Sequence, residues 1–89
     1  MGAIPIHYTV KKEIYKNPVK AYKELVEEAL YEYGHDPYSG TIANCELRGK
    51  INKPKDDEAY EEKLDKIHKR DCWYYEDDEH YHFIGWAPC

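Results

Sequence analysis

Two aromatic-rich segments close to the C-terminus most constrain the fold of this chain. They cover residues 72–75 and 80–86 and flank the acidic segment 76–79. Aromatic runs separated by a turn-sized polar segment are typical of a β-hairpin. A lone hairpin is at best marginally stable in water, so we expect further strands and helices to complete a sheet.

The hairpin predicts which side chains share a face. With Asp77-Asp78 as a two-residue turn, Trp73 lies opposite His82 and Tyr75 lies opposite His80. Both histidines then share a face with aromatic rings, and Cys72 projects to the other face.

The N-terminal part predicts a strand followed by a helix. Residues 6–11 alternate apolar and polar side chains, as in a half-buried strand. Asn17 suits an N-cap, and Pro18 suits the first helical position. Apolar side chains recur every three or four residues until Tyr33, and Gly34 supplies a C-cap.

The middle of the chain predicts a second strand and a second helix. The strand is expected at about Thr41–Leu47, and the helix at about Asp56–Lys69. The order βαβαββ is α+β, which we expect as a single domain over residues 1–89: a four-stranded, mainly antiparallel sheet with two helices on one face. The sequence leaves the strand order open.

Charge and hydropathy narrow the function classes. The net charge of −5 comes with mixed basic and acidic residues, which disfavours direct nucleic-acid binding and suits a basic protein partner. No apolar run is long enough to span a membrane, and the N-terminus lacks the pattern of a signal peptide. We expect a protein of the cytoplasm, with no membrane partner.

The cysteines and histidines predict neither catalysis nor a metal site. Cys45, Cys72 and Cys89 form an odd set without a CxxC pair, typical of reduced thiols. His80 and His82 share a strand face, but Cys72 projects to the other one. We therefore expect no enzyme activity, no cofactor and no metal.

The loop between the first helix and the second strand is a candidate ligand site. Two glycines, two hydroxyls and an imidazole there could form an anion-binding concavity, although a helix C-cap and a tight turn use the same residue types. The candidate residues in this loop are His35, Asp36, Tyr38, Ser39, Gly40 and Thr41.

A resemblance adds a biological context. Residues 28–42 (EALYEYGHDPYSGTI) and 83–87 (FIGWA) resemble short uncharacterised proteins of phages and related mobile elements. The resemblance implies no activity. It does imply that the chain inhibits or sequesters a component of a host system, inside the host cytoplasm.

Three functional hypotheses follow. The first is the capture of a nucleotide-like or other small polar ligand, with the loop amides holding an oxyanion and rings stacking on a base. The rings are those of Tyr38, Trp73, Tyr75, His80, His82 and Trp86.

The second hypothesis is an acidic protein-protein inhibitor of the nucleic-acid-mimic type. It would use the carboxylates of Glu58, Glu61, Glu62 and Asp65, together with segment 76–79. A solvated acidic face is the simpler reading of both clusters. The third hypothesis is a minor structural or assembly protein. We also expect a homo-oligomer, with Phe83, Ile84 and Trp86 at its interface.

Overall fold

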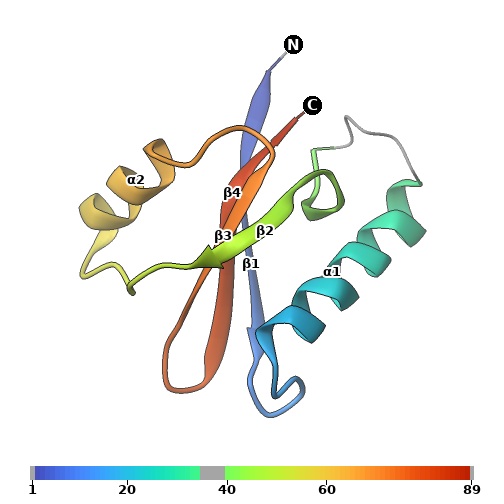
Figure 1. Cartoon of the computed structure of the whole chain (residues 1–89), viewed down its shortest axis with the longest axis horizontal. Coiled ribbons are helices and arrows are strands. Elements are labelled where there is room, and N and C mark those ends of the chain that lie inside the picture. The colour runs from blue at the N-terminus through green and yellow to red at the C-terminus, as the bar shows by residue number, and fades with distance from the viewer. Residues whose placement is uncertain (1, 35–39, 89) are drawn as a thin grey trace.

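The strands form one sheet in the order β1-β4-β3-β2 in the computed structural model, which describes residues 2–34 and 40–88 (Figure 1). Strand β4 pairs antiparallel with β1 and β3, whereas β2 pairs parallel with β3. The predicted α+β class and the mainly antiparallel four-stranded sheet are confirmed. The elements are β1 (Ala3–Lys11), α1 (Pro18–Tyr33), the 3-10 helix η1 (Ile42–Asn44), β2 (Glu46–Lys50), α2 (Asp57–Asp65), β3 (Asp71–Glu76) and β4 (His80–Pro88).

The two helices cover opposite faces of the sheet, which corrects the prediction that both lie on one face (Figure 1). Helix α1 contributes Ala21 to a core cluster with Phe83. Helix α2 contributes Leu64 to a separate cluster with Ile84. Phe83 and Ile84 are consecutive in β4 and both fully buried, so each face of this central strand requires its own apolar cover.

The β3-β4 hairpin has the predicted faces but a different register. Tyr75 lies opposite His82, and the Asp77 amide donates to the His80 carbonyl at 3.0 Å. The turn is therefore 78–79, not Asp77-Asp78 as predicted. The Asp77 carboxylate accepts hydrogen bonds from the amides at positions 79 and 80, which fixes this turn. Because the shift is two residues, the face assignment holds.

The predicted ends of α1 are confirmed, whereas the strand expected at Thr41–Leu47 is displaced. The Asn17 side chain accepts from the Val19 amide, and Gly34 has a φ of 74°. Residues 42–44 form η1, and β2 begins only at residue 46. The Asn44 side chain accepts from the Gly40 amide, and this local bond competes with an extended conformation.

Helix α2 is shorter than the expected span of Asp56–Lys69. Asp56 caps it by accepting from the Ala59 amide, and the last helical residue is Asp65. No helix in the described part of the chain is long and apolar enough to cross a membrane.

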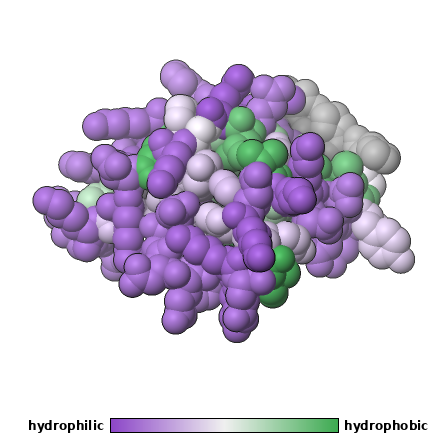
Figure 2. Space-filling view, turned by 60° about the horizontal axis from the view of Figure 1, so that its bottom comes forward, coloured by the Kyte–Doolittle hydropathy of each residue, from purple (hydrophilic) through white to green (hydrophobic). Residues whose placement is uncertain are grey.

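Phe83 and Ile84, two of the three residues predicted for a homo-oligomer interface, lie inside the monomer, whereas Trp86 is partly exposed. Strand β4 is central in the sheet, and Phe83 and Ile84 have no exposed area. The Trp86 indole donates to the Leu64 carbonyl at 2.7 Å, which ties β4 to α2. Figure 2 shows a largely hydrophilic face with only small hydrophobic areas.

Candidate functional site

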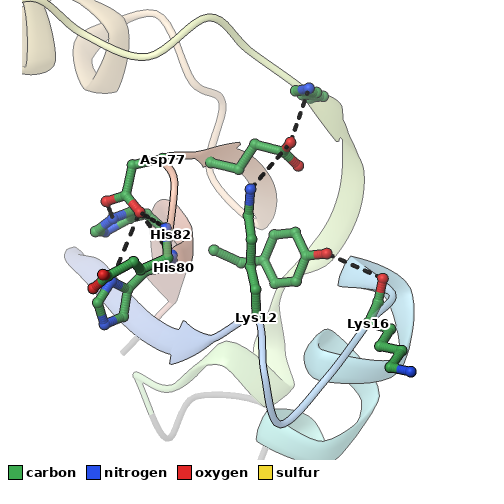
Figure 3. Close-up of polar contacts among 9 residues, drawn as sticks. Lys12, Lys16, Asp77, His80 and His82 are labelled. Atoms are coloured by element: carbon green, nitrogen blue, oxygen red, sulfur yellow. Dashed lines mark hydrogen bonds and ion pairs between the residues drawn. The ribbon is translucent and has the colours of Figure 1, made fainter.

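Three polar side chains form a hydrogen-bonded row across β1, β4 and the start of the hairpin turn. His7 Nε2 lies 3.1 Å from His82 Nδ1, and His82 Nε2 lies 2.9 Å from Asp77 Oδ2. Thr9 Oγ1 is 3.3 Å from the same Nδ1. In Figure 3 the Asp77 carboxylate faces both His82 and His80. The row joins the edge strand β1 to the hairpin.

The row fixes the protonation pattern of the two imidazoles. The carboxylate can only accept, so His82 Nε2 carries a proton. In neutral His82, Nδ1 is then the acceptor for a proton on His7 Nε2. Both facing nitrogens cannot carry protons while this bond exists. Burial, followed by repulsion from His82, lowers the pKa of His7.

The Asp77 carboxylate is held in its charged form. The hydrogen bond from His82 lowers its pKa most strongly, and the amides at positions 79 and 80 lower it further. The side chain keeps 25% of its surface exposed, so solvent remains in contact with this end of the row.

Aromatic rings support the row from both sides. Tyr75 stacks on His82 with ring centroids 4.7 Å apart. Tyr60, from α2, stacks on His7 with centroids 5.5 Å apart. Helix α2 therefore lines one side of a site whose other residues come from the sheet.

A pocket of about 350 Å³ opens between the start of α2 and these rings. This volume lies at the lower end of the range of small-molecule sites. The lining contains one lysine and three aspartates, so its charge favours a neutral or cationic guest over a phosphate. It consists of His7, Lys53, Pro54, Asp56, Asp57, Tyr60, Tyr75, Asp77 and His82.

A second hollow of about 490 Å³ lies between α2 and the edge strand β1. Pro5, Ile6 and His7 form its β1 side. Tyr60, Glu61, Leu64 and Asp65 form its α2 side, with Trp86 also in the lining. The carboxylates of Glu61 and Asp65 lie beside its apolar residues. Tyr60 and His7 line both hollows.

The predicted ring residues of β3 and β4 lie on one face, but Gly40 and Thr41, the described part of the predicted loop, do not join them. Trp73, Tyr75, His80, His82 and Trp86 follow the period-2 pattern on the α2 side. His35, Asp36, Tyr38 and Ser39 lie outside the described residues. Gly40 donates its amide to the carbonyl of Pro88. Pro88 is six positions beyond His82 in β4, or roughly 20 Å along a strand.

The described part of the loop offers no open amides. The Gly40 amide also lies 3.0 Å from Asn44 Oδ1, and the Thr41 amide lies 3.5 Å from it. Both residues are buried. Combined capture of an oxyanion at Gly40 and Thr41 and of a base at His82 is therefore not supported by the geometry.

His7 and Tyr60 are the site residues that sequence reasoning missed. His7 occupies a polar position of an alternating strand, and Tyr60 lies in the apolar stripe of a helix. Each pattern has an ordinary structural explanation. The pairing of β1 with β4 brings His7 to His82, and the packing of α2 on the sheet brings Tyr60 to His7.

The two predicted acidic clusters differ in the exposure of their carboxylates and in the ion pairs that these carboxylates form. Glu58, Glu61, Glu62 and Asp65 are all exposed along α2, as is Asp57. At the hairpin, Glu76 forms ion pairs with Lys12 and Lys50, and Asp77 binds His82. Helix α2 therefore presents the larger open acidic surface.

In the described part of the chain, Cys45, Cys72 and the carboxylates do not assemble a reactive or metal-binding centre. Burial raises the pKa of Cys45 to about 11 and that of Cys72 to about 12, which makes both poor nucleophiles. Within residues 2–34 and 40–88, no three His, Cys, Asp or Glu side chains converge to hold a metal ion.

Comparison with known proteins gives no assignment. No protein-family model matches the chain, and neither a curated protein nor a solved structure shows significant similarity to it. The resemblance to phage proteins remains an expectation.

Proposed function

We propose that this chain is a non-enzymatic binding protein that docks its acidic α2 face on a basic surface of a partner protein. The observation that carries the proposal is the row of five exposed carboxylates on α2, beside a groove that ends at Tyr60 and His7. Spaced negative charge steers a basic partner, and the groove adds apolar area to the contact. A host protein that normally holds nucleic acid fits this chemistry.

Helix α2 is fixed well enough to serve as a recognition surface. Leu64 is buried against the sheet, Trp86 binds its carbonyl, and Asp56 caps the helix. A pre-organised acidic helix loses little conformational freedom on binding. The resemblance to mobile-element proteins suggests a counter-defence role for such an inhibitor.

Charge-matched variants test this proposal. Glu58→Gln, Glu61→Gln and Glu62→Gln, combined, should weaken capture of the partner from host lysate at low salt. The combination of Glu24→Gln, Glu27→Gln and Glu28→Gln on α1 removes the same charge elsewhere and should leave capture unchanged. Capture by the wild type should fall as salt rises. Equal loss in both triple variants would reduce the effect to net charge and contradict the proposal.

A second candidate function is the capture of a small polar ligand, which the pocket beside Tyr75 and His82 favours. Its volume suits one planar ring system, and Tyr60 and His7 offer aromatic and imidazole edges. A thermal-shift panel of nucleotides, nucleobases and planar amines tests it. A true ligand at about 100 times its Kd adds roughly 2.7 kcal/mol of stability. The shift should disappear in Tyr60→Ala. A panel without any shift would remove this candidate.

A further inference from the structure

The outer edge of β1 is a long strand edge without a strand partner in the described sheet. Strand β1 has nine residues and pairs only with β4 in the described sheet. The opposite edge, β2, has five residues, an irregular register after Leu47, and exposed charged side chains at Glu46, Arg48 and Lys50. Such features protect an edge against strand addition. The β1 edge is longer and regular in register, and Pro5 and Lys11 are the protective features that it carries.

The hydrogen-bond pattern shows which backbone groups face that edge. The Lys12 amide donates to the Glu79 carbonyl at 2.8 Å, in the register of the β1-β4 pair. In an antiparallel ladder this makes alternate residues, including Tyr8, point their backbone groups toward β4. The amides and carbonyls of His7 and Thr9 therefore point outward.

Pro5 supports this orientation. It lies two positions before His7, so its missing amide hydrogen belongs to the outer edge. Proline is tolerated in strands where its nitrogen faces away from the ladder. The usable part of the edge is thus centred on His7 and Thr9.

The groove beside this edge indicates which side chains an added strand needs. The 490 Å³ hollow between β1 and α2 has Pro5, Leu64 and Trp86 among its apolar lining. A strand added along β1 would direct alternate side chains to this face of the sheet. One apolar side chain could enter the hollow. Its neighbours would approach Glu61 and Asp65 on the rim.

We propose that the β1 edge and α2 together take an extended peptide segment of a partner by strand addition. The segment carries an apolar side chain for the hollow and lysine or arginine at alternating positions for the α2 carboxylates. Main-chain bonds to His7 and Thr9 supply affinity, while the hollow and the carboxylates supply selectivity. This inference rests on the proposed function and gives it a binding mode.

A matched pair of variants tests the main-chain bonds. Thr9→Pro removes the outward amide hydrogen, and Thr9→Val retains it. Both variants lose the hydroxyl near His82, so the difference between them reports on the outward amide and on the proline ring that replaces it. The probe is the most enriched peptide from a displayed library of random ten-residue sequences selected on the wild-type chain, synthesised and titrated by calorimetry.

We expect enriched peptides to be basic with apolar residues between the charges. Thr9→Pro should weaken their binding about tenfold relative to Thr9→Val, the scale of one lost hydrogen bond with an unpaired partner. In the wild type, bound peptide should slow hydrogen exchange of the His7 and Thr9 amides. This exchange measurement decides the matter if Thr9→Pro does not fold.

Other outcomes separate the inference from the proposed function. Equal affinity of folded Thr9→Pro and Thr9→Val, or unchanged exchange at His7 and Thr9, overturns strand addition. If the double variant Glu61→Gln with Asp65→Gln still weakens binding of the same peptide, docking on the acidic face stands without strand addition. Peptide affinity could also be the same in both Thr9 variants and unchanged in the Glu61/Asp65 double variant, or no basic peptide could be enriched. Either result overturns strand addition and removes the support for the acidic-face proposal.

Discussion

Tyr75 and His82 lie face to face across the β3-β4 pair, with ring centroids 4.7 Å apart and ring planes only 9° apart. The stack holds the imidazole parallel to the Tyr75 ring while Asp77 binds its Nε2. One face of each ring is therefore used inside the protein. What remains for a guest is the Tyr60 and His7 side of the pocket.

Asp77→Asn should destabilise the protein in a pH-dependent way. The pKa of Asp77 is lowered in the folded state, first by His82 and then by two backbone amides. The stabilisation is present above the unfolded pKa of about 4 and is lost as pH falls toward the lower folded value. Urea unfolding at pH 7 should show a less stable variant, and the gap should narrow below about pH 4. A pH-independent gap would contradict the assigned cause.

His7 should remain neutral at pH values where a free histidine begins to gain a proton. Its folded pKa is lowered by burial and by His82, so the unfolded state binds more protons below about pH 6.5. Stability should decrease as pH falls through that value and level off below the folded pKa. Titration of the His7 ring signals by NMR gives the pKa directly. In His7→Gln this part of the pH dependence of unfolding should disappear, whereas Lys11→Gln should keep it.

Trp86→Phe should loosen α2 without unfolding the sheet. The change removes the donor of the 2.7 Å bond to the Leu64 carbonyl and keeps an aromatic ring in the α2 cluster. We expect a loss of about 1 to 2 kcal/mol and faster hydrogen exchange in α2. Trp73→Phe is the control, because its indole makes no hydrogen bond within the described residues. Equal exchange in both variants would show that this bond does not anchor the helix.

Local signals explain what the sequence predicted well. Asn17 and Pro18 start α1, and Gly34 ends it, because caps depend on neighbouring backbone groups alone. The shared face of Tyr75 and His82 follows from strand period, which survives a two-residue shift of the pairing register.

Long-range contacts determine the features that the sequence did not predict. The adjacent apolar residues Phe83 and Ile84 indicate that β4 is buried on both faces. Only the tertiary arrangement places a different helix on each face of the sheet. The strand expected from Thr41 was lost to η1 because the Asn44 side chain binds the preceding amides. The partnership of His7 with His82 depends on β1 pairing with β4, which local patterns do not determine.

Cys45 and Cys72 should resist alkylation in the folded protein. Burial raises the pKa of both thiols, so little thiolate exists near neutral pH, and solvent hardly reaches them. Iodoacetamide followed by peptide mass spectrometry should show slow labelling of both sites in buffer and rapid labelling in urea. Fast labelling of either site in buffer would show that the core around it opens.

Gly85→Ala should be among the most damaging single-methyl changes in this chain. Gly85 lies opposite Cys72 in the central strand pair, and a Cβ there would overlap the Asp71 carbonyl oxygen and stand 3.1 Å from Cys72 Cα. Both obstacles are backbone atoms and cannot rotate away. We expect a loss of about 3 kcal/mol in urea unfolding, the upper part of the range for overpacking.

Gly34→Ala provides the control for the methyl itself. Gly34 has a positive φ of 74°, but a Cβ there meets no atom of the described residues within 4 Å. The variant should lose about 2 kcal/mol, within the range for a residue with a side chain held in a φ, ψ region that glycine favours. If the two glycine variants lose equal stability, the β3 and β4 backbones can separate at Gly85, and the close approach of these strands does not require glycine.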